Sequence, residues 1–277
     1  MRRAVRSGDG LDLEVVEFGG DGRPILLLHG LMGRASTWWT VARRLTAHGR
    51  VLGLDARGHG RSQAAGPWTV DRMAADAADV LEPLGPAAVI GHSMGGLHGL
   101  ALAARRPDLV RSLVVEEMGV DFRGHDAAAA DAWFRAVPQP FGSLAAVREA
   151  FGWPRPEVGD YMAECVEERA DGYHLLARVE HTSAIAGEWA RRDFRGLLAA
   201  VRCPVLLIEA AESVAPPGQM AEMARLLPDA RHVRLPGTGH LVHAAADPFQ
   251  AVVEEFLTRW PAPPRPGPGP GRRGAAR

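Results

Sequence analysis

The feature that most constrains this chain is a glycine-flanked turn, Gly-His-Ser-Met-Gly, at residues 91–95. An apolar run precedes it at 86–90 and a helix-like run follows at 96–104, so the pattern predicts a buried strand, a sharp turn and a helix. A serine at such a turn has a strained backbone conformation that lifts its hydroxyl above the sheet. The following helix supplies free N–H groups and the positive end of its dipole. We therefore predict that Ser93 is a nucleophile.

A second turn offers amide groups that would stabilise the charge formed when such a serine reacts. The apolar run at 24–28 ends in His29-Gly30, and a glycine at this bend lets the next backbone curl over the sheet. The N–H of Leu31 would then point at a bound oxygen, together with the N–H of Met94. Two such donors form an oxyanion hole, usually the largest electrostatic contribution to acyl transfer.

A histidine late in the chain is the candidate general base. His240 ends the run Gly-Thr-Gly-His and precedes a final amphipathic segment at 248–260. A serine hydroxyl needs a nearby imidazole to accept its proton near neutral pH, so we assign that role to His240. His243 follows three residues later and would suit a metal site with His240, but the sequence shows no third ligand. We therefore interpret His243 as structural.

Together these motifs resemble those of the α/β-hydrolases, in which the nucleophile comes first in the chain, the acid next and the histidine last. A further segment, Asp-Ala-Arg-Gly-His-Gly-Arg-Ser at 55–62, resembles the loop that follows the fourth strand of these proteins. The resemblance runs from about Leu11 to Trp260 and lapses only in the middle section. It implies a mostly parallel α/β sheet with flanking helices and a helical cap between the sixth and seventh strands.

The hydrophobic pattern predicts a compatible order of elements. Strands are expected at 11–18, 25–29, 51–55, 87–91, 113–117, 205–209 and 232–235, and helices at 37–47, 70–84, 94–105, 218–227 and 248–260. Ligands bind at the carboxyl ends of strands in such sheets, which is where Leu31, Ser93 and His240 would lie.

The acid is where the chain departs from the commoner family pattern. An aspartate usually follows the strand at 204–208, but here Ser213 stands in its place and Glu212 lies one residue out of register. Some α/β-hydrolases carry the acid at the end of the preceding strand, where this chain has Glu117. Side chains alternate along a strand, so only one of Glu116 and Glu117 can face the histidine. We assign the acid to Glu117; the alternatives are Glu212 first, then Glu209 and Asp121.

The chain divides into a first part of the core at 1–120, a helical cap at 121–198, a second part of the core at 199–260 and a Pro/Gly/Arg tail at 261–277. The tail has no apolar residues to bury and is predicted to be disordered. Cap helices are expected at 127–137, 143–151, 157–169 and 174–186. The cap is rich in aromatic residues, some of which, with Trp38 or Trp39, should line an apolar acyl or aryl pocket: Trp133, Phe134, Phe141, Phe151, Trp153, Tyr161, Tyr173 and Trp189. Three histidines of this region are expected at the surface: His125, His174 and His181.

Composition excludes several other chemistries. All 32 basic residues are arginine, which rules out a lysine Schiff base and the lysine of a phosphate-binding P-loop. A net charge of −1 gives no basic field for nucleic acid or for a membrane surface. Cys165 and Cys203 suggest reduced thiols, and the first residues lack the apolar core of a signal peptide, so we expect a cytoplasmic protein. Enrichment in Arg, Ala, Gly and Pro without Lys or Asn suggests a bacterial origin.

These observations predict a cofactor-free serine hydrolase, without a metal, that cleaves a small carboxylic ester through an acyl-enzyme. A thioesterase and a carbon–carbon bond hydrolase are variants of the same chemistry. A non-hydrolytic cyclase, a cofactor-free oxygenase or a small-molecule-binding protein would use the same scaffold differently. The serine at the turn excludes the dehalogenases and epoxide hydrolases of this fold, which use an aspartate there.

Overall fold

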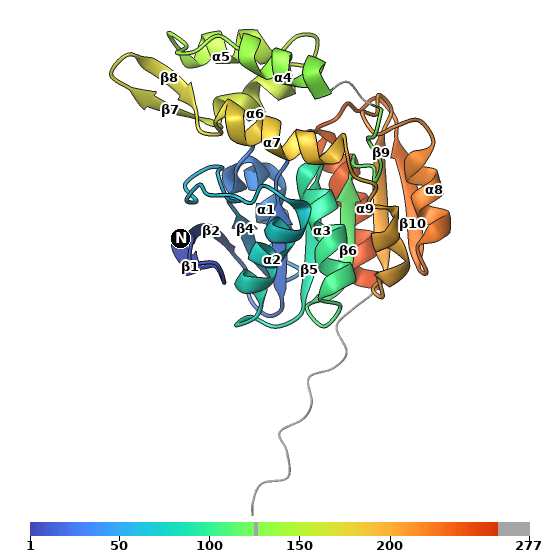
Figure 1. The fold of residues 1–277 in the computed structure, drawn as a ribbon. Helices are drawn as coiled ribbons and strands as arrows, with labels where there is room; N and C mark the ends of the chain where they lie inside the picture. The colour runs from blue at the N-terminus through green and yellow to red at the C-terminus, as the bar shows by residue number, and fades with distance from the viewer. Residues whose placement is uncertain (125–126, 260–277) are drawn as a thin grey trace, which may run out of the picture.

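The computed structural model describes residues 1–124 and 127–259. His125 and the predicted disordered tail at 261–277 lie outside the described residues. The centre of the molecule is one eight-stranded sheet in the order β1-β2-β4-β3-β5-β6-β9-β10 (Figure 1). The strands are β1 (Arg2–Arg6), β2 (Asp12–Gly19), β3 (Pro24–Leu28), β4 (Arg50–Leu54), β5 (Ala87–His92), β6 (Val110–Glu116), β9 (Val205–Ala210) and β10 (Ala230–Leu235).

The sheet is parallel from β4 to β10, whereas β2 pairs antiparallel with both β1 and β4. The seven predicted strands are all present, with ends that differ by up to three residues. β1 was not predicted, because its sequence Arg-Arg-Ala-Val-Arg has no apolar run and it pairs at the edge of the sheet. The mostly parallel α/β fold expected from the sequence is confirmed.

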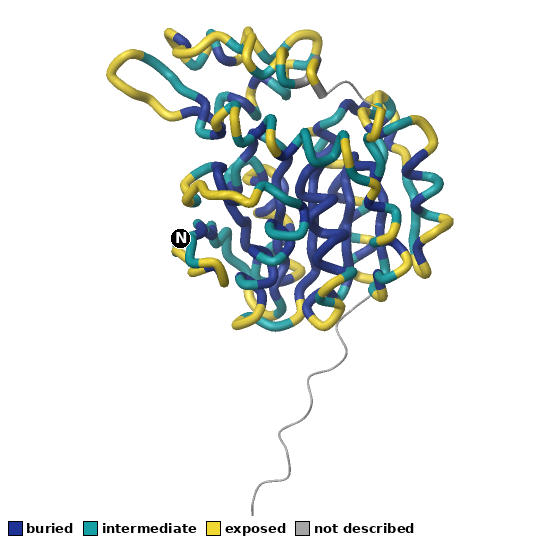
Figure 2. Tube along the Cα trace, viewed as in Figure 1, coloured by how far each residue is buried: buried dark blue, intermediate teal, exposed yellow. Residues whose placement is uncertain are grey.

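Helices cover both faces of the sheet, as Figure 1 shows. On one face, α2 (Val70–Leu81), α3 (Met94–Arg105) and α8 (Gln219–Leu226) pack over a large apolar core. On the other face, α1 (Trp39–Leu45) and α9 (Ala246–Arg259) enclose a second core. The trace in Figure 2 shows that the central strands are buried almost throughout. None of the described helices is long and apolar enough to cross a lipid bilayer.

Between β6 and β9, the sixth and seventh strands of the main sheet, the chain forms a separate layer over one end of the sheet (Figure 1). We call residues 121–198 the insertion. It contains α4 (Ala127–Ala136), α5 (Leu144–Phe151), α6 (Pro156–Ala163), a hairpin of β7 (Val166–Arg169) and β8 (Gly172–Leu175), α7 (Val179–Trp189) and the start of the 3-10 helix η2 (Arg195–Ala200).

The hairpin corrects two expected helices, at 157–169 and 174–186. The helix α6 ends at Ala163, and α7 begins only at Val179. The chain reverses after Arg169, where Gly172 has a positive φ of 134°. Tyr173 of the hairpin also pairs with Phe141 through two backbone hydrogen bonds. Pairing with a distant segment decides this structure, and helical periodicity alone does not reveal it.

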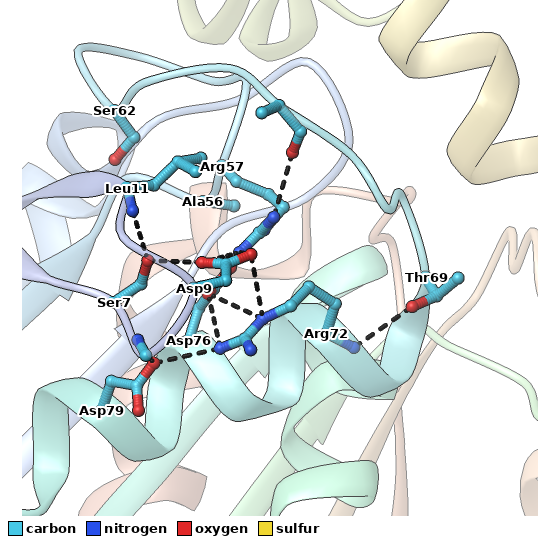
Figure 3. A network of polar contacts seen from close by, with 12 residues as sticks. Ser7, Asp9, Leu11, Ala56, Arg57, Ser62, Thr69, Arg72, Asp76 and Asp79 are labelled. Atoms are coloured by element: carbon cyan, nitrogen blue, oxygen red, sulfur yellow. Dashed lines mark hydrogen bonds and ion pairs between the residues drawn. The ribbon is translucent and has the colours of Figure 1, made fainter.

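A buried ion network ties the loop after β4 to the first helix of the large core (Figure 3). The Arg57 guanidinium is fully buried and donates to both oxygens of Asp76 in α2, at 2.6 and 2.7 Å, and to Asp9 at 2.9 Å. Burial raises the pKa of Asp76 despite these bonds. Arg72 also donates to Asp76 and to Asp79. Removing one member of such a buried pair typically costs about 3–5 kcal/mol, so the network fixes the β4 loop in place.

Three histidines are buried beside this network: His29 after β3, His59 in the β4 loop and His98 in α3. Burial lowers the pKa of His29 to about 4, and the pKa values of His59 and His98 to about 3. Each ring is therefore neutral in the folded protein near neutral pH.

These histidines predict that the fold loses stability in mild acid. In the unfolded chain a histidine titrates near 6.5, so stability is full above that pH and is lost as the pH falls toward the folded values. At pH 5 each buried neutral ring should lower the free energy of unfolding by about 2 kcal/mol. His98→Leu should therefore reduce the fall in the free energy of unfolding between pH 7 and pH 5 by about this amount, measured by urea unfolding. His174→Gln, which changes a partly exposed ring of the β7–β8 hairpin, is the control. An equal fall in wild type and His98→Leu would contradict the prediction.

Candidate active site

Ser93 lies in the turn between β5 and α3 with a strained backbone, φ 49° and ψ −120°. Close backbone packing requires the flanking glycines: a Cβ on Gly91 would collide with the carbonyl of Gly95, and a Cβ on Gly95 with that of Leu28 in β3. The Ser93 amide donates to the backbone oxygen of Glu116, in the neighbouring strand β6, at 2.8 Å. This is the geometry expected for a nucleophile elbow, in which backbone packing enforces the turn.

The segment after β3 brings the Leu31 amide to the same place. Leu31 and Ser93 line one cavity, and Met94 begins α3 directly after the serine. Within residues 1–124 and 127–259, the amides of Leu31 and Met94 donate to no other group. The next residue, Met32, has a positive φ of 65°, which turns the chain sharply. Leu31 lines this cavity and Met94 directly follows Ser93, so their free amides can hold an oxyanion formed at the serine.

The motif at 55–62 holds this segment in position. Asp55 accepts a hydrogen bond from the amide of Ala35 at 2.6 Å and another from Arg61 at 2.9 Å. The His29 ring accepts a hydrogen bond from the amide of Ala56 at 3.0 Å. The ends of β3 and β4 are thus joined on both sides of the Leu31 turn.

His240 faces Glu117, as the sequence predicted for the acid. The His240 Nδ1 lies 3.4 Å from Oε2 of Glu117, which is fully buried. Glu117 also accepts hydrogen bonds from the amides of Ala210 at 2.7 Å and Val214 at 3.0 Å. Burial on its own would raise the pKa of Glu117, but the bonds from His240 and these amides, with a further one from Ser213, outweigh it and lower the pKa. The carboxylate is therefore ionised near neutral pH.

The alternative acids contact other groups. Glu212 is 71 % exposed and forms an ion pair with Arg155 at 2.6 Å. Glu209 binds His232 at 2.7 Å. Asp121 pairs with Arg123 and Arg195 at the base of the insertion. Ser213 occupies the usual aspartate position, and the amide of the next residue, Val214, donates to Glu117. The longer Glu117 side chain therefore reaches the turn that normally carries the acid.

Reasoning from the sequence missed a second buried histidine–carboxylate pair. Nδ1 of His243 lies 2.9 and 3.0 Å from the two oxygens of Glu116, and the His243 amide donates to the same carboxylate at 2.9 Å. His92 joins them, so the ligand atoms of these three residues lie within 4.8 Å of one another. This group does not include His240, so it is not the His240–His243 metal site considered from the sequence, and the contacts of His243 are compatible with its predicted structural role. The signal was the Glu116-Glu117 repeat opposite His240 and His243.

The cavity at Ser93 has a volume of about 440 Å³ and is lined mainly by rings of the insertion. Of the predicted aromatic residues, those that line it are Trp133, Phe134, Phe151, Trp153, Tyr161 and Trp189. Trp38 and Trp39 do not line it, contrary to expectation. Trp38 is buried and stacks on His243 with ring centroids 4.4 Å apart, and Trp39 borders a separate cavity. Phe141 is buried within the insertion, and the expected surface residue His181 stacks on Trp68.

Comparison with known proteins agrees with this geometry. The family model described as the alpha/beta hydrolase fold matches residues 23–151. The chain is 31% identical to the putative carbamate hydrolase RutD of Azorhizobium caulinodans over 257 residues, which covers 87% of this chain and 93% of that relative. The chain belongs to the α/β-hydrolase family.

Other known proteins are similar to this chain over most of its length. The magnesium-chelatase 30 kDa subunit of Rhodobacter capsulatus is 31% identical, with 89% of this chain and 91% of that one covered. Among solved structures, E-2-(acetamidomethylene)succinate hydrolase has a TM-score of 0.84 at 25% identity, covering 93% of this chain and 99% of that chain. The enol-lactonase of Burkholderia xenovorans LB400 has a TM-score of 0.74, also at 25% identity, covering 93% and 100%.

The elbow packing predicts that Gly95→Ala is not tolerated. The added methyl group would meet the backbone oxygen of Leu28, which cannot move without disturbing β3. We expect a loss of at least about 2 kcal/mol in the free energy of unfolding, measured by urea denaturation. Gly99→Ala in the same helix is the matched control, because its methyl group would meet side-chain ends rather than backbone: Leu113 closely and Val89 at an ordinary contact distance. Equal stability of the two variants would show that the elbow is looser than described.

Proposed function

We propose that the protein is a serine hydrolase that cleaves a small carboxylic ester through a Ser93–His240–Glu117 triad. The observation that supports this most directly is the contact between His240 and the buried, ionised Glu117 at the cavity that holds the strained Ser93. A carboxylate bound to Nδ1 holds the ring in the tautomer whose Nε2 accepts a proton. Glu117 also stabilises the imidazolium that forms.

In the proposed reaction, His240 takes the proton of the Ser93 hydroxyl while the serine oxygen bonds to the substrate carbonyl carbon. The negative charge moves to the carbonyl oxygen, where the Leu31 and Met94 amides hold it. When the tetrahedral intermediate collapses, the bond to the leaving alcohol breaks and His240 gives the alcohol its proton. Water then attacks the acyl-enzyme by the same route, releasing the acid and restoring Ser93.

The insertion acts in this proposal as a cap that supplies an apolar acyl or aryl pocket. Six aromatic rings border the cavity, while its polar groups are concentrated at Ser93, His92 and His240. Such a distribution fits a substrate that buries an apolar group and presents one carbonyl to the serine. Carbon–nitrogen bonds of amides or carbamates are the second candidate, because one relative is named a carbamate hydrolase and another hydrolyses an acetamidomethylene compound.

The triad assignment predicts distinct effects for two glutamates. Ser93→Ala should lower kcat on p-nitrophenyl esters by on the order of 10⁴-fold or more and abolish labelling by a fluorophosphonate. Glu117→Gln should lower kcat by about 10²- to 10⁴-fold, because the imidazolium loses its charge partner. Glu212→Gln is the control and should stay within about twofold of wild type, because its carboxylate is exposed and pairs with Arg155.

Two results would contradict the proposal. Loss of activity in Glu212→Gln alone would move the acid to that residue. A wild-type protein that neither turns over esters of graded chain length nor reacts with the probe would favour a non-hydrolytic enzyme or a binding protein on the same scaffold.

A further inference from the structure

The loop that carries His240 is attached to β6 by two consecutive carboxylates rather than one. Glu117 contacts the His240 ring, and Glu116 contacts both the ring and the backbone of His243, three residues later. Glu116 is the last residue of β6, and Glu117 follows it with a positive φ of 54°; the two glutamates reach the loop at two separate points. We propose that the Glu116–His243 pair, together with His92, forms an anchor that positions His240 for proton transfer with Ser93. This inference rests on the proposed function.

The triad contact needs such an anchor because it is weak. The distance of 3.4 Å between His240 Nδ1 and Glu117 Oε2 exceeds the roughly 2.7–2.9 Å of a strong charge-assisted hydrogen bond. The His240 side chain is also 31 % exposed, so packing encloses it only in part. By contrast, the bonds between His243 and Glu116 are 2.9–3.0 Å long and fully enclosed. The loop is therefore fixed more firmly at His243 than at the catalytic ring.

His92 restrains the loop at its other end. Its Nε2 lies 3.0 Å from the backbone oxygen of His240, and because a carbonyl only accepts, His92 must donate. Burial lowers the pKa of His92 well below its usual value, so the ring remains neutral and keeps a single N–H for this bond. His92 directly precedes Ser93 in the chain. The nucleophile's own strand thus holds the backbone of the base.

Burial of the pair argues for a positioning role. Glu116 is fully buried, and only 4 % of the His243 side chain is exposed. Buried ion pairs contribute little net stability compared with apolar residues of similar size, because both groups lose water. The pair instead fixes an orientation. The Glu116 carboxylate accepts hydrogen bonds from both the amide and the ring of His243, and Trp38 stacks on that ring. This combination fixes both the backbone and the ring of His243.

The same three residues also have the composition of a metal site, but their hydrogen bonds favour an anchor. Both oxygens of Glu116 already receive a proton donor from His243. A cation bound there would displace the Nδ1 proton and break the contact that orients the loop. Metal dependence is therefore the alternative that the experiment must distinguish.

The test compares Glu116→Gln with a matched pair elsewhere on the sheet. We expect Glu116→Gln to lower kcat on p-nitrophenyl esters by about ten- to a hundredfold, with KM nearly unchanged, because a small displacement of the base impairs proton transfer more than binding. His243→Asn keeps an N–H donor close to the Nδ1 position and should retain more activity than His243→Ala. The control is His232→Gln, which disrupts the Glu209–His232 pair of β9 and β10 and should stay within about twofold of wild type.

A second readout does not depend on turnover. Displacing His240 lengthens the contact between its Nδ1 and Oε2 of Glu117. The NMR resonance of the proton on His240 Nδ1 should therefore move upfield in Glu116→Gln, measured at a single pH. His232→Gln should leave this resonance unchanged.

Three results would overturn the anchor. One is a Glu116→Gln variant whose His240 Nδ1 proton resonance and kcat match those of wild type. Another is a loss of activity that only follows the unfolded fraction, with an unchanged Nδ1 proton resonance. The third is wild-type activity that falls on dialysis against EDTA and returns with Zn²⁺, which would make the cluster a metal site. If wild type itself shows no ester turnover and no probe labelling, the proposed function fails, and the His240 Nδ1 proton resonance still decides the anchor.

Discussion

The candidate site depends on three adjacent parallel strands, β3, β5 and β6, ending at the same edge of the sheet. Each strand end contributes a different group: the Leu31 amide after β3, Ser93 after β5 and Glu117 after β6. The strands can approach this closely at the elbow only because Gly91 and Gly95 have no side chains. Since the hydrogen-bonded register of the sheet sets the spacing, the backbone fixes the relative positions of these groups before any side-chain contact is made.

Much of this arrangement could be predicted from the sequence because its signals are local. The elbow, the glycine bend after His29 and the helix at 94–105 are each encoded within a few residues, and the helix bounds agree with the prediction. Glu117 was found because the family pattern offers only a few positions for the acid. The contact with His240 then needs no long-range information beyond the order of the strands.

Other features could not be read from the sequence because they depend on distant partners. Glu116 and His243 are 127 residues apart, and the Glu116-Glu117 repeat alone does not show which residue Glu116 would contact. The β7–β8 hairpin forms where helical periodicity continues, because Tyr173 finds a backbone partner in Phe141. Trp38 is apolar and precedes a helix, which suits a pocket wall or a core position equally well, and contacts with His243 and Phe249 decide for the core.

The packing of Met32 has a consequence for how members of this family diverge. Met32 follows the Leu31 amide, has a left-handed backbone, and is buried in the apolar cluster of the insertion with Phe141, Val147 and Met162. Arg34, two residues later, pairs with Glu164 at the end of α6. The segment that presents the amide therefore belongs structurally to both layers. A chimera that exchanged only residues 121–198 would lose the contacts that Met32 and Arg34 make with the insertion. The smallest unit that can be exchanged between family members is therefore the insertion together with residues 32–34.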